Sequence, residues 1–220
     1  HPYFFGEGSN NITKTFPSLN GTFDRDCEAY YGINTTSFLK GDKNTGWTGS
    51  VLPSFSERIN DPKLGYTPDF ALVHLGTNDA DSTKELITLT RNNIIEVAKI
   101  LRLKNPKVVI LLAKLITPWK KINIEIDGLC SELTTSISPV ISVDLATGFI
   151  NDPGASGTMT YDWVHPNKIG QIFMMRGWYK ALMANLNDKI SPKLKSSIAL
   201  AKVNDVSAEL SWDLGTDNYG

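Results

Sequence analysis

The alternation of short apolar runs with helix-like segments is the feature that most constrains how this chain can fold. The apolar runs are 69–75 (DFALVHL), 107–118 (KVVILLAKLITP) and 139–145 (PVISVDL). The segments that follow them, in order, are 81–105, 121–138 and 167–187. Short continuous apolar runs are typical of strands that are buried on both faces of a parallel sheet. The alternation therefore predicts a three-layer α/β/α fold, in which right-handed crossovers connect the strands of a parallel sheet.

The three helix-like segments differ in how clearly the sequence marks them. The segment 81–105 has apolar residues near helical spacing, and Ser82 or Thr83 is available as its N-cap. The segment 121–138 is a weaker pattern, and we expect Gly128 to interrupt it. For the last helix, the sequence predicts that Pro166 takes the first helical position.

The two ends of the chain have a different character from its middle. Residues 1–68 are rich in Gly, Asn, Ser, Thr and Pro, which predicts irregular structure with at most short strands and a helical turn near 51–59. Residues 191–220 contain strand-like alternation in SAELSW and a turn at GTDNYG, and they resemble the start of a fibronectin type III module. We therefore expect one domain over 1–190, followed by a linker and the start of a second module.

Charge and cysteine content exclude several classes of protein. The chain has 22 basic and 23 acidic residues, a formal net charge of -1, so nothing favours nucleic acid or an anionic membrane as partner. No apolar run approaches the length of a membrane span. Cys27 and Cys130 lack the C-x-x-C spacing of a zinc or redox site, and they are either two buried thiols or one disulfide. The chain opens on His1 and its first methionine is Met159, so we expect natural sequence upstream.

Asp162 and His165 form the first candidate catalytic element. An acidic residue three positions before a histidine can accept a hydrogen bond from one imidazole nitrogen and leave the other to act as a base. The helix predicted to follow would also favour the neutral imidazole through its dipole. The alternative is that both residues only mark a helix start. Of the other histidines, His74 lies inside an apolar run and is interpreted as a core residue, and His1 is terminal.

Two loops supply further candidates. The sequence GTND (76–79) follows the first apolar run, where parallel sheets place their binding sites. Asn78 could offer its amide to an oxyanion, and Asp79 could cap the following helix, although an ordinary strand-to-helix turn is the better explanation of these residues taken alone. Farther upstream, Gly32 could present an unobstructed backbone N–H, with Asn34, Thr35 and Thr36 tying that turn to neighbouring strands.

Taken together, these elements resemble the SGNH/GDSL hydrolase family over about residues 24–187. The stretches that carry the resemblance are DRDCEAYYGINTT, TGWTG, YTPDFALVHLGTND and TYDWVHPNKIG, and they are most similar to the acetyl xylan esterase-like carbohydrate esterases. The resemblance implies a flavodoxin-like fold, Gly32 and Asn78 as oxyanion donors, Asp162 and His165 as two members of the triad, and no metal or organic cofactor. The substrates implied are acetylated polysaccharides or small esters, and the implied location is outside a bacterial cell.

This sequence departs from the family pattern at its start. The family's first block, a strand followed by Gly-Asp-Ser with the nucleophilic serine, has no match in the chain, so the N-terminal strand is expected to be missing. Ser9 in FFGEGSNN is a weak substitute, because Gly8 stands in place of the aspartate and no helix pattern follows. Cys27 and Ala29 also replace the His and Gly usual in this branch.

Two functions follow from these observations. The first is a serine-type ester hydrolase, inactive in this chain for want of its nucleophile. The second is a degenerate esterase fold that binds carbohydrate through exposed aromatic residues such as Trp47, Trp119 and Trp163. A metal phosphodiesterase is a distant third, because His165 with scattered acids is not a two-metal ligand set.

Overall fold

The computed structural model divides the chain into two compact units, His1–Ala181 and Leu182–Gly220. It describes residues 28–30, 32–42, 51–63, 65–185, 199–204 and 207–211. Ser9, Cys27 and Trp47 lie outside these residues, so the predictions that concern them stay predictions. Within the described residues, no helix is both long enough and apolar enough to span a membrane.

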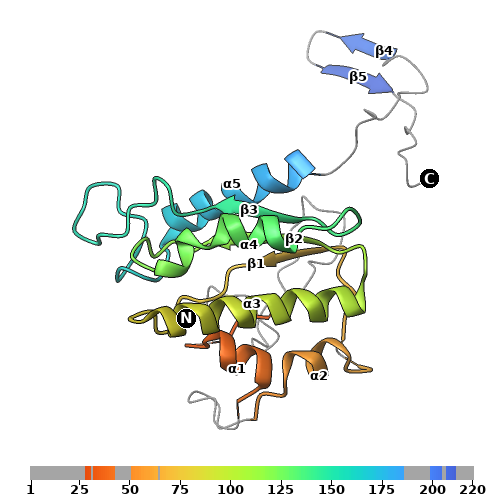
Figure 1. Ribbon diagram of the computed structural model, residues 1–220. Coiled ribbons are helices and arrows are strands. Elements are labelled where there is room, and N and C mark those ends of the chain that lie inside the picture. The colour runs from red at the N-terminus through yellow and green to blue at the C-terminus, as the bar shows by residue number, and fades with distance from the viewer. Residues whose placement is uncertain are drawn as a thin grey trace. The chain divides into compact units, whose positions relative to one another are not determined.

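A parallel sheet of three strands forms the centre of the first unit (Figure 1). Its strands are β1 (Phe70–Val73), β2 (Val109–Lys114) and β3 (Val140–Asp144), in that spatial order. Phe70 pairs with Val109, and Ile110 pairs with Val140. The parallel α/β sheet predicted from the apolar runs is therefore confirmed, and its three carboxyl ends meet at one edge.

The three strands are not equally buried. Leu111 and Leu112 of the central strand β2 are almost completely buried, as expected of a strand covered on both faces. Leu72 of β1 is instead 46% exposed. No residue of β1 is fully buried, so the expectation of burial on both faces is wrong for this edge strand.

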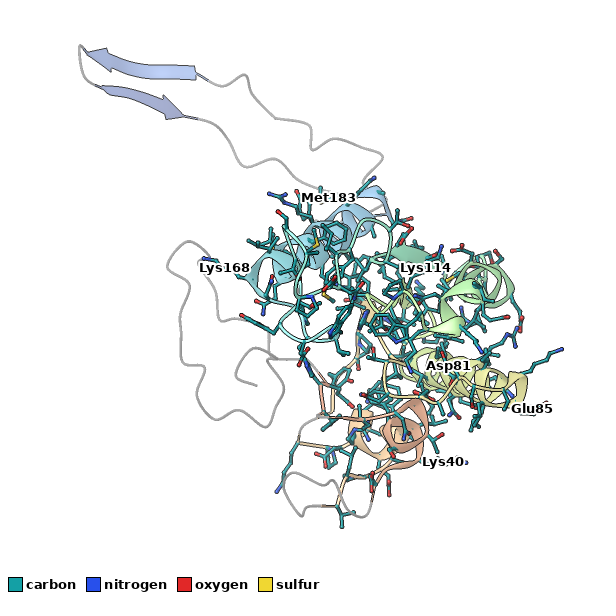
Figure 2. The ribbon with its side chains drawn as sticks, turned by 90° about the vertical axis from the view of Figure 1, so that its left-hand side faces the viewer. Lys40, Asp81, Glu85, Lys114, Lys168 and Met183 are labelled. Atoms are coloured by element: carbon teal, nitrogen blue, oxygen red, sulfur yellow. The ribbon has the colours of Figure 1, made fainter. Side chains whose placement is uncertain are left out.

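Helices lie on both sides of the sheet. The helix α3 (Lys84–Lys104) is capped by Thr83, whose hydroxyl accepts from Leu86 N–H at 3.4 Å, and it buries an apolar stripe against one sheet face. The start of α5 (Lys168–Asn185) lies on the other side of the sheet (Figures 1 and 2). There Phe173 packs edge-on against Phe149, with ring centroids 5.6 Å apart.

The segment 121–138 differs from the prediction in where it is broken. It forms a short 3-10 helix, η1 (Lys121–Ile124), and then α4 (Ile126–Leu133). The break falls at Glu125, and Gly128 lies inside α4. Leu129 and Cys130 on α4 are buried, so packing outweighs the intrinsic cost of a glycine in the helix.

Residues before 68 hold more helix than the composition predicts. A helix α1 (Thr35–Lys40) begins at Asn34, whose side chain accepts from Ser37 N–H at 2.8 Å. The predicted turn near 51–59 is α2 (Phe55–Ile59), which has a capping box between Ser54 and Glu57. Composition underestimated the helix content of this region because the two helices are short and depend on side-chain caps.

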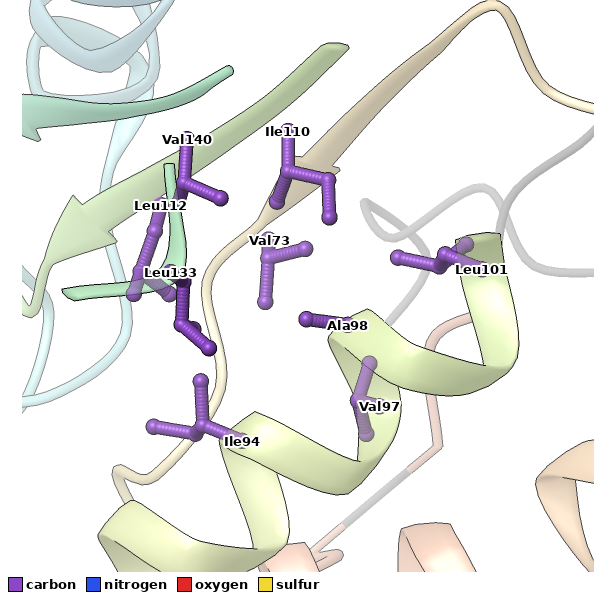
Figure 3. Close-up of a pocket in the computed structure, with 9 residues that line it drawn as sticks. All are labelled: Val73, Ile94, Val97, Ala98, Leu101, Ile110, Leu112, Leu133 and Val140. Atoms are coloured by element: carbon purple, nitrogen blue, oxygen red, sulfur yellow. The ribbon is translucent and has the colours of Figure 1, made fainter. Parts of the chain in front are cut away.

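A small apolar cavity lies between α3 and the sheet (Figure 3). Its volume is about 10 Å³, far below that of a substrate pocket. It is lined by Val73, Ile94, Val97, Ala98, Leu101, Ile110, Leu112, Leu133 and Val140. Its lining has no group that could take part in catalysis, so it is a packing defect of the core.

In the second unit, the described residues 199–204 and 207–211 form an antiparallel hairpin. Its strands are β4 (Ala199–Asn204) and β5 (Ser207–Ser211), with Asn204 paired to Ser207. The strand-like alternation of SAELSW thus does mark a strand. The fibronectin type III assignment and the boundary at residue 190 stay predictions.

Candidate active site

Asp162 and His165 are in direct contact. The imidazole Nδ1 lies 2.7 Å from Asp162 Oδ2, and the backbone N–H of His165 donates to Asp162 Oδ1 at 2.8 Å. One carboxylate therefore contacts both the backbone and the ring of the same histidine. This arrangement fixes the ring orientation and favours the tautomer with its proton on Nδ1, in which Nε2 is the basic nitrogen.

The electrostatic state of Asp162 suits this contact. Partial burial acts to raise the pKa of the carboxyl, but hydrogen bonds from the backbone and ring of His165 and from Val164 N–H outweigh it. The pKa of Asp162 is therefore held below its usual range. The carboxylate stays ionised at neutral pH, as the partner of a protonated imidazole must.

The loop that carries the pair is closed by backbone bonds. Tyr161 N–H donates to the His165 carbonyl at 2.9 Å, and Thr160 and Pro166 form an isolated antiparallel bridge on either side. At the tip of the loop, Trp163 N–H donates to Thr160 Oγ1 at 3.2 Å. Because these bonds bring the two ends of the loop together, Asp162 and His165 are held on one short rigid turn.

The start of α5 differs from the prediction. Pro166 does not occupy the first helical position, since it lies in the bridge to Thr160 and α5 begins at Lys168. Asn167 caps this helix, with its Oδ1 accepting from Ile169 N–H at 2.9 Å. The sequence held a signal for this cap, because an Asn followed by a helical segment is a common N-cap.

Asn78 and the Gly32 turn lie side by side. Asn78 Nδ2 donates to the Ile33 carbonyl at 3.0 Å, which fixes its amide next to Gly32. Gly32 has φ 65°, is exposed, and has nothing within 4 Å of the place where a side chain would begin. A primary amide has two N–H groups, so Asn78 can make this contact and still offer a second donor.

Asp79 acts on α1 and not on the helix that follows it. Its carboxylate accepts from Thr35 N–H at 2.8 Å and from the Thr35 hydroxyl at 2.5 Å. Thr83 caps α3 instead, so the prediction that Asp79 caps that helix is wrong. The side-chain amide of the buried Asn93 in α3 donates to the hydroxyls of Thr35 and Thr36. The sequence predicted that these two threonines would tie the Gly32 turn to neighbouring strands, but they tie it to a helix.

The two candidate loops are joined through the backbone of one residue, Ile116, which lies two residues after β2. Ile116 N–H donates to His74 Nε2 at 3.4 Å, and His74 directly follows β1 and precedes the Asn78 turn. The Ile116 carbonyl accepts from the buried Asn151 Nδ2 at 2.5 Å, and the same Nδ2 contacts the Trp163 carbonyl at 3.2 Å. The loops of Asn78 and His165 are therefore both anchored at the carboxyl edge of the sheet.

Sequence reasoning missed Asn151 and gave His74 only a packing role. Asn151 stands in NDPG, which reads as an ordinary turn, and no local pattern indicates that its amide is buried. His74 is largely enclosed, as predicted for a core residue, but its Nε2 also holds the loop after β2.

Burial of His74 has a measurable consequence for stability. Burial lowers the pKa of His74 to about 4 from its ordinary value of 6.5. Between these values the unfolded chain binds a proton that the folded chain does not, so stability is lost as the pH falls below 6.5. We expect a loss of about 2 kcal/mol between pH 7 and pH 5, measured by urea unfolding. The variant His74→Gln should lose much of this pH dependence, and equal dependence in both proteins would contradict the assignment.

Aromatic side chains are exposed around these loops. Trp119 and Trp163 are each 51% exposed, and Tyr161 is 55% exposed. Trp119 follows Thr117, in the segment where Lys120 Nζ donates to the Asp79 carbonyl at 2.6 Å.

Cys130 is a buried free thiol, and burial raises its pKa to about 11. Among the described residues, no group of three or more His, Cys, Asp or Glu is arranged to hold a metal ion.

Comparison with known proteins gives two similar structures. A carbohydrate esterase family 3 protein from Talaromyces cellulolyticus is 28% identical, with a TM-score of 0.48 over 62% of this chain and 69% of that one. A serine-to-alanine mutant of an acetyl esterase, with an acetate ion, is 26% identical, with a TM-score of 0.46 over 59% of this chain and 66% of that one. Both are esterases, the class that the sequence motifs resemble. The chain spans about two thirds of the length of each of these two proteins. No protein-family model matches the chain. No curated protein matches it either.

Proposed function

We propose that this chain carries the base, the orienting acid and two oxyanion donors of a serine-type carboxylic ester hydrolase. The observation that carries the proposal is the 2.7 Å contact between Asp162 Oδ2 and His165 Nδ1. The anchoring of that loop and of the Asn78 turn at the same residue, Ile116, supports it further. A catalytic base and an oxyanion donor must act on one substrate carbonyl, so they must lie at the same edge of the sheet.

Each residue has a distinct role in the proposed reaction. His165 Nε2 takes the proton of the nucleophilic serine as its oxygen attacks the ester carbonyl, and Asp162 stabilises the imidazolium that forms. Gly32 N–H, the Asn78 amide and the serine's own N–H then stabilise the negative oxygen of the tetrahedral intermediate. His165 returns the proton to the leaving alcohol, and water repeats the sequence on the acyl-enzyme.

The substrate we propose is an acetyl ester on a polysaccharide. The motif resemblance supports this class, and the near-zero net charge suits a neutral carbohydrate. Such polymers lie outside cells, so we extend the proposal to export from a bacterium. Detection of the protein only in the cell lysate of its source, and not in the culture medium, would contradict the location.

The nucleophile is unassigned, and this gives the direct test. Ser9 lies outside the described residues, and the sequence contains no Gly-Asp-Ser block. We expect the 220-residue chain to show almost no hydrolysis of an aryl acetate and no labelling by a serine-directed phosphonate. A form extended at its N-terminus by an apolar strand and Gly-Asp-Ser should hydrolyse the ester and be labelled at the new serine. Mass spectrometry of the labelled peptide identifies the site.

Two outcomes of this experiment would change the proposal. Stoichiometric labelling of Ser9 would show that the nucleophile is already present in the chain. An extended form that is folded, as judged by thermal unfolding, but hydrolyses no ester would contradict the esterase function.

The exposed indoles of Trp119 and Trp163 favour a second candidate, a degenerate esterase fold that only binds carbohydrate. A pure binding protein has no need of a histidine oriented by a carboxylate. Carbohydrate binding without hydrolysis in the extended form would favour this second function over the first.

A further inference from the structure

The backbone of Trp163 has a conformation that its side chain disfavours. Its φ is 72°, and among the described residues it is the only one other than glycine with a positive φ. A bulky residue in the left-handed region is a genuine outlier, because its Cβ crowds the neighbouring carbonyl oxygen. Glycine would adopt the same conformation without this strain.

Two buried side chains hold Trp163 in this conformation. Its N–H donates to the hydroxyl of Thr160, which is 2% exposed, at 3.2 Å. Its carbonyl accepts from the amide of Asn151, which is 7% exposed, at 3.2 Å. Strained residues persist where the surroundings over-determine the backbone, and they concentrate at functional sites.

Packing of the indole gives limited compensation for the strain. Trp163 is 51% exposed at the tip of the loop, and Tyr161, two residues earlier, is 55% exposed. The strained backbone of Trp163 therefore places an aromatic ring at the surface, on the same closed turn as Asp162 and His165.

We propose that Trp163 is a specificity-determining residue whose indole stacks on the sugar ring that bears the ester, a proposal that rests on the proposed esterase function. An acyl chain would call for an enclosed apolar cavity, and an exposed indole does not provide one. A flat apolar face with a donor at its edge instead matches a pyranose, which has apolar C–H faces and a polar rim. The ring lies one residue from Asp162 and two from His165 in sequence, so a stacked sugar would present its acetyl group near the base.

The test combines thermal unfolding with ligand binding, both on the 220-residue chain. Trp163→Gly should raise Tm by roughly 2–4 °C, because strain is relieved. The same variant should weaken binding of acetylated xylotetraose about 3- to 10-fold by calorimetry, the loss expected for one aromatic contact. Trp163→Phe keeps both the strain and a ring, so it should leave Tm unchanged and retain most of the affinity. Trp119→Gly is the matched control, since Trp119 is equally exposed without a positive φ, and it should not raise Tm.

Each alternative outcome overturns the inference. A Tm lowered as much in Trp163→Gly as in the control Trp119→Gly would show that the backbone at residue 163 is not strained. Unchanged xylotetraose affinity, or no binding by the unmodified chain, would show that the indole does not contact sugar. Equal weakening of butyl acetate binding would show that the indole contact does not depend on a sugar ring. The esterase proposal is read from turnover in the extended form and this inference from xylotetraose affinity of the 220-residue chain, so the failure of one is distinguishable from the failure of the other.

Discussion

Replacing His165 with alanine should lower kcat for an aryl acetate by about 10⁶-fold in the form that carries the Gly-Asp-Ser block. A serine hydroxyl is a poor nucleophile at neutral pH, and its attack depends on a base that takes the proton. Because nucleophile and base act as one unit, loss of either removes nearly the whole acceleration of the triad. Steady-state hydrolysis of the aryl acetate measures the effect, and residual turnover should reflect the oxyanion donors alone.

Two controls make the His165 result interpretable. The side chain of His165 is 38% exposed, so His165→Ala removes little core packing and should leave Tm almost unchanged. Imidazole added to the solution should restore part of the rate if the missing group is a base. Turnover within tenfold of the unmodified form would assign the base to another residue and end the proposed mechanism.

The parts of the site that the sequence predicted are those set by local spacing. Asp162 and His165 are three residues apart, so their spacing alone allows one tight turn to bring carboxylate and imidazole together. The sheet was also predictable, because apolar runs and parallel pairing depend on the same burial. Asn78 was placed at the correct edge by the rule that loops after parallel strands form binding sites.

The parts that the sequence did not predict depend on backbone groups and on distant partners. Ile116 joins the two loops through its N–H and carbonyl, which every residue type possesses, so its identity carries no signal. Asp79 accepts hydrogen bonds from Thr35, 44 residues earlier, whereas local reasoning assigned it to the nearest helix start. The left-handed backbone of Trp163 was equally invisible, because a tryptophan indicates the opposite preference.

Replacing Asp162 with asparagine should lower kcat by about 10⁴-fold while leaving the loop folded. The new side-chain oxygen can still accept from the backbone N–H of His165, which donates to Asp162 Oδ1 at 2.8 Å. The amide NH₂ would then replace Oδ2, which lies 2.7 Å from the ring Nδ1. Because an amide nitrogen donates, it favours an Nδ1 that accepts, and the proton moves to Nε2, where the base is needed.

The ionisation state of Asp162 and a control substitution at a second aspartate make this prediction more specific. Hydrogen bonds hold the pKa of Asp162 below its usual range, so the carboxylate of the unmodified enzyme is charged throughout the neutral region, and titration of Asp162 should not change the difference in kcat between the two proteins there. Asp152→Asn is the matched control, because Asp152 Oδ1 also accepts a backbone N–H two residues on, from Gly154 at 2.8 Å, and Asp152 has no role in the proposed reaction. The control should retain nearly full turnover. If Asp162→Asn also retained it, with Tm unchanged, the carboxylate would serve the loop alone and His165 would act without an orienting acid.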